Sequence, residues 1–294
     1  MKSKILAIGE IIWDVYPEKK TLGGAPLNFA AHTVLCRADS ALISAVGRDE
    51  LGDEAIEDLL SLGVDCKYIQ RNERPTGQCL VTLDEKKTPH YNVLCDVAYD
   101  AIVTDRSMLT HLKKEAYDAL YFGTLIQRDA RSREAVESLV RTLSLSHVIC
   151  DVNLRPNCYD RQSVALCLEH ATILKLSIEE EPLLRAAADY APLDDSPKEI
   201  ARALCQAHPQ LEVVIVTLGK DGSYAYDARA QKDFFREAVG DCVVSTVGAG
   251  DSYTAAFLTS YLAGSSIDQC MRYASEVSGW VVSHMEAIPQ NGHP

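Results

Sequence analysis

Residues 243–264, VVSTVGAGDSYTAAFLTSYLAG, contain the strand–turn–helix step that decides the fold class of this chain. A β-branched run enters Gly248-Ala249-Gly250-Asp251, an apolar amphipathic helix follows, and Gly264 ends it. The two turn glycines let the backbone bring its N–H groups close to a ligand. Unpaired amides and the helix dipole at a helix N-terminus favour an anion. The segment predicts a layered α/β protein with an anion site at the start of a 251–262 helix.

Two other phosphate-binding patterns do not fit this chain. The P-loop pattern G-x-x-x-x-G-K-[ST] is absent from the sequence, and Lys220 has no glycine at the required offset. A dinucleotide fingerprint needs glycine or alanine at position 253, which is Tyr253. The glycine turn itself therefore has to explain the anion site.

Asp251 in this turn has two interpretations. As a helix N-cap it would satisfy helix amides and do nothing else. As a functional carboxylate it would accept a proton from a substrate hydroxyl. The helix dipole would keep it ionised and weakly basic, which suffices for a loose phosphoryl-transfer transition state. In that case the amides of Gly248, Ala249 and Gly250 would hold the charge that develops on the transferred phosphoryl group.

Short β-branched runs alternate with longer amphipathic stretches over the rest of the chain, as in βαβ sheet proteins. Because the strand runs are almost continuously apolar, helices should cover both faces of a mostly parallel sheet. We therefore expect a single α/β domain over residues 1–294, in three layers. The expected strands are residues 5–8, 41–46, 119–122, 147–151, 173–176 and 213–217. The expected helices are residues 28–36, 53–62, 131–143, 160–170, 179–188, 197–208, 251–262 and 267–283.

One part of the chain breaks this alternation. Residues 76–102 are typical of strands without an intervening helix, with a turn near 84–88. Together with 13–21 they predict a small sheet that projects from the body. The inserted segments cover about 11–22 and 75–103.

The projecting sheet has two possible uses. It could close over a site within one chain as a lid. It could equally pair with a second copy across a homodimer, because its apolar positions alternate. The alternating positions are Leu80, Thr82 and Asp84 against Cys79, Val81 and Leu83.

Composition narrows the classes of partner and location. The 294 residues carry a formal net charge of −13, which repels nucleic acid and anionic membranes, so neither is an expected partner. No apolar stretch is long enough to span a bilayer. Glu10 and Asp14 interrupt the first apolar run too early for a signal peptide, so this run is expected to be a buried strand. The ten cysteines show no C-x-x-C pair, which predicts reduced thiols in a cytoplasmic protein.

Two motifs give the chain a family resemblance. Residues 245–251 resemble the second signature of the ribokinase-like (PfkB) sugar kinases, D-T-x-G-A-G-D, and GGAPLNFA at 23–30, followed by VGRDELGD at 46–53, matches the first. The resemblance extends from Ile8 to Pro289, and the stretch at 9–32 is most similar to fructokinases. It implies a ribokinase-like three-layer sandwich with a mostly parallel central sheet and a small β lid. It also implies ATP and Mg²⁺ as cofactors.

The resemblance assigns a sugar site to the N-terminal part of the chain. It implies that Asp14, Gly24 and Asn28 meet the sugar hydroxyls. A polyol needs short polar side chains, and glycine allows close approach of the backbone. Taken alone, Asp14 would be a turn residue at a strand end and Asn28 would be a helix cap.

A third motif follows a central strand. Asp151-Val152-Asn153-Leu154-Arg155 matches the family's D-x-N-x-R, and the carboxyl edge of an α/β sheet is where ligands bind. The resemblance implies that Asn153 contacts the substrate, and Arg155 could clamp a phosphate oxygen. A surface salt bridge is the alternative role for Arg155.

The turn TLGKDG at 217–222 resembles the family's nucleotide-side turn. There Thr217, Gly219 and Gly222 would lie beside the phosphates or the ribose of ATP. As a bare T-x-G-x-x-G the segment would be an ordinary strand-ending turn, so its assignment depends on its place in the order of motifs.

Three positions depart from the family pattern. Ser177 stands where the family has Asn in Asn-x-x-Glu, whereas Glu180 is retained and by resemblance organises water around Mg²⁺. Ser245 replaces an Asp that contributes to a monovalent cation site in relatives, and Glu286 replaces a Gly near the same site. We hypothesise that Glu286 restores the charge lost at Ser245, so that the site could bind K⁺. Loss of a dispensable site is the alternative.

The sequence thus predicts an ATP-dependent kinase that phosphorylates a hydroxyl of a small sugar, most similar to a fructokinase. Ribose and 2-keto-3-deoxygluconate are alternative substrates, because selectivity depends on the lid and a few pocket side chains. A non-catalytic sugar-binding protein built on a degenerate kinase is a different class of function. ATP consumption that depends on sugar would distinguish it from an enzyme.

Overall fold

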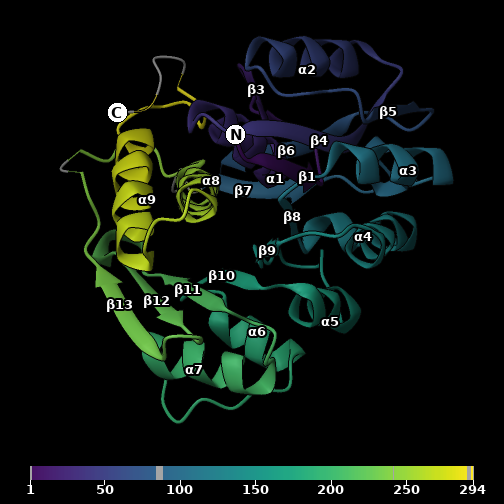
Figure 1. The fold of residues 1–294 in the computed structure, drawn as a ribbon. Coiled ribbons are helices and arrows are strands. Elements are labelled where there is room, and N and C mark those ends of the chain that lie inside the picture. The colour runs from purple at the N-terminus through teal and green to yellow at the C-terminus, as the bar shows by residue number, and fades with distance from the viewer. Residues whose placement is uncertain (1, 84–88, 241, 290–292, 294) are drawn as a thin grey trace.

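The structure is a computed structural model that describes residues 2–83, 89–240, 242–289 and 293. The strands of its main sheet are β1 (Lys4–Ile8), β4 (Asp39–Gly47), β5 (Ile69–Asn72), β8 (Ala119–Gly123), β9 (His147–Asp151), β10 (Ile173–Ser177), β11 (Val213–Thr217), β12 (Ser223–Asp227) and β13 (Lys232–Arg236). Their order is β13-β12-β11-β10-β9-β8-β1-β4-β5 (Figure 1). Strands from β11 to β5 pair in parallel, whereas β12 and β13 add antiparallel at one edge.

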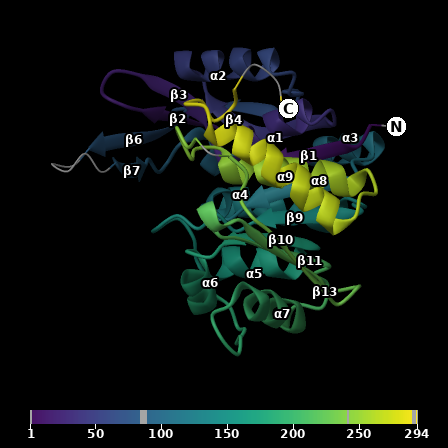
Figure 2. The same cartoon turned by 90° about the vertical axis from the view of Figure 1, so that its left-hand side faces the viewer.

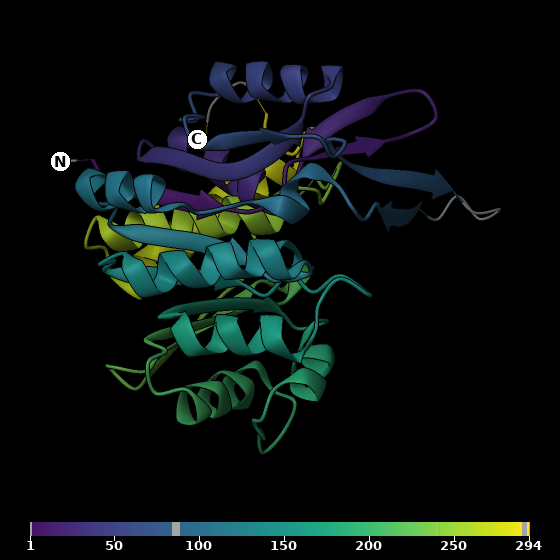
Figure 3. The same ribbon diagram turned by 90° about the vertical axis from the view of Figure 1, so that its right-hand side faces the viewer.

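Helices cover both faces of this sheet. Ile5 and Ala7 of β1 pack in one apolar cluster, and Leu6 and Ile8 pack in the other, since successive side chains of a strand point to opposite faces. The first layer contains α1 (Ala25–Leu35), α2 (Glu50–Ser61), α8 (Ala249–Leu262) and α9 (Ile267–Val282). The second contains α3 (Arg106–Glu115), α4 (Ala130–Thr142), α5 (Arg161–His170), α6 (Glu181–Ala187) and α7 (Pro197–Ala207). Figure 2 shows α8 and α9 in front of the sheet, and Figure 3 shows the opposite layer.

A second, four-stranded sheet projects from the body (Figure 3). Its order is β3 (Lys20–Gly23), β2 (Ile12–Val15), β6 (Gly77–Leu83) and β7 (Pro89–Val93). The parallel pairing of β2 with β6 joins two segments that lie far apart in the sequence. The expected three-layer sandwich with a projecting sheet is therefore confirmed.

Most expected elements are present with small shifts of their ends. The strands expected at 147–151 and 213–217 have the same bounds in the structure. Helix α8 begins at Ala249 rather than at 251, with Gly248 as its N-cap. Helix α1 begins at Ala25 rather than at 28, because Pro26 suits the first turn of a helix.

Two expectations need correction, and a third is not tested. The strand expected throughout 76–102 ends at Val93, and Ala98–Ala101 forms a short 3₁₀ helix (η1) whose Tyr99 is fully buried. The turn expected near 84–88 lies outside the described residues. Helix α3 and strands β5, β12 and β13 were not expected. The sequences of α3 and β5 are largely polar, and α3 buries Leu112 alone. Within the described chain, no helix combines the length and apolar character that a bilayer crossing requires.

Candidate active site

The polar residues of the predicted site gather at the carboxyl edge of the parallel strands. Glu10 follows β1, Asp151 ends β9, Ser177 ends β10 and Thr217 ends β11. Because the strands are parallel, their carboxyl ends share one edge of the sheet, where α/β proteins bind ligands. The first turn of α8, containing Asp251, points its amides to the same edge.

Asn28 and Asp251 meet across the two helices that begin at this edge. The Nδ2 of Asn28 donates a hydrogen bond to the Oδ2 of Asp251 over 2.8 Å. Asn28 is 4% exposed, and its Oδ1 is buried without a hydrogen-bond partner among the described residues. A buried amide oxygen in this state is an acceptor that a ligand hydroxyl can satisfy. Asn28 lies inside α1 and Asp251 inside α8, so neither is a helix cap.

The acidity of Asp251 differs from the sequence-based expectation. Burial raises its pKa to about 6, and the charge of Asp151 acts in the same direction. The hydrogen bond from Asn28 and the charges of Lys175 and Arg155 lower the pKa, without reversing the effect of burial. The carboxylate is still mostly ionised at pH 7, but it is a stronger base than one governed by the helix dipole alone.

The glycine turn presents amides to the site, although not all those expected. Gly248 has φ +80°, and a Cβ there would lie 2.6 Å from the carbonyl oxygen of Ala287, so the turn requires glycine. The amide of Ala249 lies 3.3 Å from the carbonyl oxygen of Thr246. Within the described part of the chain, the amides of Gly248, Gly250 and Asp251 have no recorded backbone acceptor, so these three are free donors at the start of α8, and only that of Ala249 departs from the expected set.

The expected sugar residues surround the same edge. Gly24 has φ +112°, and a Cβ there would lie 2.5 Å from the carbonyl oxygen of Glu10. Asp14 lies on β2 in the projecting sheet, where burial raises its pKa and a hydrogen bond from Cys79 lowers it. The charge of Arg155 lowers the pKa of Asp14, Glu10 and Asp251.

Arg155 and Asn153 lie in the loop after β9. Arg155 is exposed, and the structure records no ion pair for it with a described residue, so a surface salt bridge finds no support. Asn153 is half-buried and adopts φ +40°. A left-handed asparagine at a strand end is a feature of turns and of functional loops.

Glu10 lies at the candidate site but was not predicted as a site residue from the sequence. Its side chain is 3% exposed, and burial raises its pKa to about 7. Backbone amides and Arg155 act against this rise, whereas Asp251 adds to it. The sequence did contain a signal for this residue, because Glu10 is a carboxylate placed directly after a buried strand. We had interpreted it only as an interruption of an apolar run.

Lys175 is a second unexpected residue. Its Nζ lies 2.7 Å from the Oδ2 of Asp151, and the two side chains are 7% and 2% exposed. Thr254 also donates to this Oδ2, over 3.3 Å, while the Oδ1 of Asp151 is buried without a partner among the described residues. A lysine in the middle of the apolar run ILKLS was the sequence signal.

Glu180 connects the loops after two strands. Its Oε1 accepts the amide of Leu154 over 2.7 Å, and its Oε2 accepts the amide of Ser177 over 2.8 Å. Among the described residues, no three or more His, Cys, Asp or Glu side chains are grouped as a metal site would require. Glu180 thus joins the loop after β9 to the end of β10 through both of its carboxylate oxygens.

The predicted cation site shows no contact between its two residues. Ser245 is half-buried, and its Oγ accepts the amide of Val247 over 3.3 Å. Glu286 is exposed, and no hydrogen bond or ion pair to a described residue is recorded for it. The proposed compensation between them therefore gains no geometric support.

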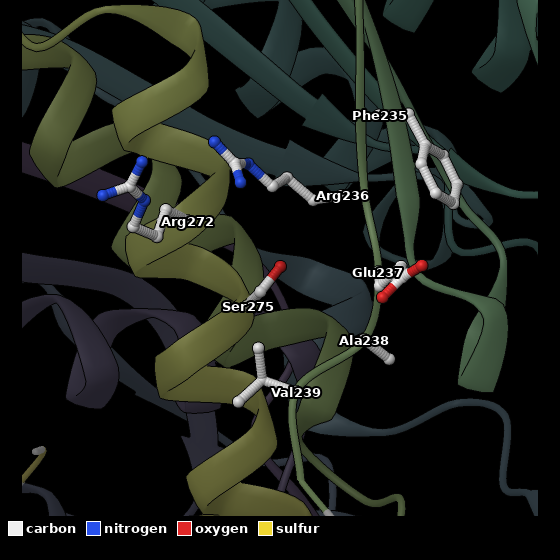
Figure 4. A pocket seen from close by; sticks show the side chains of 7 residues that line it. All are labelled: Phe235, Arg236, Glu237, Ala238, Val239, Arg272 and Ser275. Carbon is white, nitrogen blue, oxygen red and sulfur yellow. The ribbon is translucent and has the colours of Figure 1, made fainter.

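The nucleotide-side turn borders a pocket. Gly219 has φ +57° and open space where a Cβ would be, whereas a Cβ on Gly222 would lie 2.0 Å from the carbonyl oxygen of Arg236. A pocket of about 450 Å³ begins at this contact, between the end of β13 and α9 (Figure 4). Its volume lies in the range of small-molecule sites. The lining residues are Phe235, Arg236, Glu237, Ala238, Val239, Arg272 and Ser275.

Comparison with known proteins relates this site to one family. The family model described as "pfkB family carbohydrate kinase" matches residues 4–292. An ATP-dependent 6-phosphofructokinase of Thermoanaerobacterium thermosaccharolyticum is 25% identical over 98% of this chain and 90% of its own. A 5-dehydro-2-deoxygluconokinase of Listeria monocytogenes is 26% identical over 90% and 81%. A fructokinase of Salmonella typhimurium is 25% identical over 90% and 86%.

Solved structures of other proteins share the fold of this chain. A fructokinase from Vibrio cholerae, in a form with bound fructose, ADP and calcium ion, superimposes with a TM-score of 0.79. It is 20% identical and covers 97% of this chain and 94% of its own. At this identity the likeness concerns the fold, which is the ribokinase-like sandwich expected from the sequence.

Proposed function

Because the chain belongs to the pfkB family of carbohydrate kinases, and is thus a phosphotransferase with a sugar hydroxyl as acceptor, we propose that Asp251 is its catalytic base and fructose its substrate. The observation that carries this proposal is the 2.8 Å bond from Asn28 to Asp251. It fixes a half-buried carboxylate beside the free amides of α8 and next to the unpartnered oxygen of Asn28.

Each group at this edge has a task in phosphoryl transfer. Asp251, with a pKa of about 6, is ionised at neutral pH and accepts the proton of the attacking hydroxyl. The amides of Gly250 and Asp251 bind the charge on the transferred phosphoryl group. Mg·ATP, when bound, supplies that group, and the metal neutralises part of its charge. Arg155 approaches the same oxygens from the loop after β9.

We assign the sugar to the space between α1 and the projecting sheet. The Oδ1 of Asn28 accepts a hydrogen bond from one sugar hydroxyl, and Asp14 and Asn153 form hydrogen bonds with other hydroxyls. Gly24 lets the backbone approach the ring, since no side chain stands between it and the site. These short polar groups suit a polyol.

We assign the nucleotide to the opposite side of Asp251. Thr217 and Gly219 contact its phosphates or ribose, and Gly222 lies against the wall of the pocket at Arg236. The pocket between β13 and α9 then receives the base (Figure 4). Glu180 positions the water around Mg²⁺.

We propose that the projecting sheet is a lid. Cys79 and Val81 of β6 are 3% and 2% exposed and lie on the side of Asp14, whereas Leu80 on the other side is 37% exposed. The inner face thus already covers the sugar side of the site. The outer face would be the contact surface of a homodimer.

We propose a cytoplasmic location on the basis of the cysteines. All ten cysteines are free thiols, and six of them are buried. Buried thiols of this kind behave as small apolar side chains in a reducing compartment.

The catalytic proposal is tested by Asp251→Asn. This change keeps the size of the side chain and removes the base, so turnover should fall by about 10⁴-fold, a loss at the upper end for general-base catalysis. ATP binding, measured by calorimetry, should change little. Asp58→Asn on the exposed face of α2 is the control and should keep full activity. Retained turnover in Asp251→Asn would remove this residue from the mechanism.

The substrate is tested by a panel of acceptors at equal concentration. Fructose should give the highest kcat/KM. Two curated relatives act on a sugar phosphate and on a deoxy-keto sugar acid, so fructose 6-phosphate and 5-dehydro-2-deoxygluconate join ribose and 2-keto-3-deoxygluconate in the panel. A higher value for any of these would reassign the substrate while leaving Asp251 in its role.

A further inference from the structure

Lys175 is a buried cation at the candidate site. The proposed function assigns no role to it. It lies in the middle of β10, where its neighbours Leu174 and Leu176 are fully buried. Burying an ammonium costs free energy unless a partner compensates, and the carboxylate of Asp151 at 2.7 Å does so. Burying such a pair costs free energy, although an apolar residue at position 175 would suffice for packing.

The ammonium lies directly beneath the glycine turn. A Cβ on Gly250 would be 3.1 Å from the Nζ of Lys175, so the Cα of Gly250 packs against the charged group. The hydroxyl of Thr254 binds both the carbonyl of Gly250, over 2.8 Å, and Asp151, over 3.3 Å. The ion pair is thereby attached to the first turn of α8, and the unpartnered Oδ1 of Asp151 leaves the pair incompletely satisfied.

The charges of carboxylates from three elements act on Lys175. They belong to Asp151 at the end of β9, Glu180 before α6 and Asp251 in α8. Burial acts against the charge of Lys175, but these three carboxylates outweigh it and raise its pKa, so the amine is an ammonium at every working pH. In turn Lys175 and Arg155 favour the ionised form of Asp251, and Asp151 disfavours it.

We propose that Lys175 is a positioning residue for phosphoryl transfer: fixed by Asp151 beneath Gly250, its ammonium adds positive charge to the first turn of α8, which contains Asp251. This inference rests on the proposed role of Asp251 as the base. Lys175 does not touch the reacting atoms in this account; it acts through Gly250 and Asp251. It supplies a fixed positive charge in a chain whose formal net charge is −13.

Two substitutions should move the acidity of Asp251 in opposite directions. In Lys175→Met the new side chain has a similar length but no charge. The acid limb of the kcat/KM profile should lie near pH 6 in the parent, and this variant should move it to higher pH. Its kcat on the plateau should fall about a hundredfold, as for loss of one donor to the developing charge. Asp151→Asn removes the opposing negative charge and should move the acid limb to lower pH.

A measurement on the free protein makes the test independent of activity. The pKa of Asp251 is followed by carbon NMR of γ-¹³C-aspartate, with its signal assigned by its loss in Asp251→Asn. We expect the same opposite shifts for Lys175→Met and Asp151→Asn. If either variant fails to fold, the other still gives a sign, and Lys175→Arg provides a charged replacement for the first.

The outcomes separate this inference from the proposed function. If the parent protein phosphorylates sugars but Lys175→Met leaves both the acid limb and the NMR pKa unchanged, the inference is wrong and the function stands. If Asp251→Asn keeps its turnover, the proposed role of Asp251 as the base fails, while the NMR shifts still decide the electrostatic link. Shifts of the same sign in both variants would indicate loss of structure and would also overturn the inference.

A matched control distinguishes electrostatics from stability. Asp100→Asn breaks another buried ion pair, with Arg128, whose side chains are 9% and 4% exposed. It should lower the melting temperature at least as much as Lys175→Met does, and it should leave the acid limb in place. An equal shift of the limb in this control would show that the profile reports only stability.

Discussion

Two buried ion pairs of similar exposure differ in how completely their atoms are bonded. Arg128 and Asp100, near the root of the projecting sheet, are 9% and 4% exposed, and Lys175 and Asp151, beneath the glycine turn, are 7% and 2% exposed. The Nε and Nη2 of Arg128 donate to both oxygens of Asp100, over 2.8 and 2.9 Å, and Nη2 also donates to the carbonyl of Leu94. This two-point geometry leaves neither partner in need of a ligand.

The pair at the active-site edge is incomplete by comparison. Lys175 makes one recorded hydrogen bond within the described chain, and the Oδ1 of Asp151 has no partner there. Buried polar atoms are nearly always satisfied, so the Oδ1 of Asp151 has capacity for one more donor, whereas the carboxylate of Asp100 is fully bonded. The comparison teaches that two pairs of similar burial can differ in how completely they are bonded.

The largest expected effect on stability is at Arg128. Arg128→Met leaves the carboxylate of Asp100 buried and without its cation, which should lower the free energy of unfolding by about 3–5 kcal/mol. Denaturant unfolding measures this loss. Arg141→Met, which removes an exposed ion pair with Glu137, is the control and should cost less than about 1 kcal/mol. Equal losses in the two variants would break the comparison.

Glu10 is a third buried carboxyl, and it forms no recorded ion pair with a described residue. Its pKa in the folded protein is about 7, against an ordinary value of 4.5, mainly because of burial. The folded state therefore holds this proton more tightly, and its contribution to stability is complete below pH 4.5 and is lost as the pH rises through 7. The loss amounts to about 3 kcal/mol.

Glu10→Gln tests this expectation, because it removes the titration. Unfolding free energies are compared at pH 5, 6, 7 and 8. The variant should gain stability relative to the parent as the pH rises, and the exposed Glu134→Gln should run parallel to the parent. Curves for Glu10→Gln that are parallel to the parent would mean that Glu10 titrates normally.

The smallest expected effect is at Glu286, an exposed carboxylate on the other side of the glycine turn. Because no contact joins it to Ser245, Glu286→Gln should change the rate and its response to added K⁺ by less than about twofold. Rates are measured with and without K⁺ in both proteins. A K⁺ activation that disappears in the variant would restore the hypothesis that Glu286 is a cation ligand.

The sequence singled out two residues of the candidate site that lie far apart in the chain. Asp251 and Asn28, more than two hundred positions apart, were both identified from local motifs, and the structure joins them by a hydrogen bond. The acidity of Asp251 was expected to follow the helix dipole, yet burial dominates it. Burial depends on every segment that packs around the group, so no local pattern contains it.

The elements missed by the sequence share a physical cause. Strand β5 has the polar sequence IQRN at the edge of the sheet, and α3 is mostly polar with one buried residue. Elements that bury little apolar area carry a weak periodic signal, and their neighbours determine their form.

The sequence by itself determined most of the parallel strands and their helices, the glycine turn and the family motifs, since each depends on residues close together in the chain. Only the tertiary structure decided that Lys175 lies beneath Gly250, that Glu10 becomes a weak acid and that one ion pair is satisfied while another is not. The reason is that desolvation and charge–charge energies depend on distances between elements, which the folded sheet brings together.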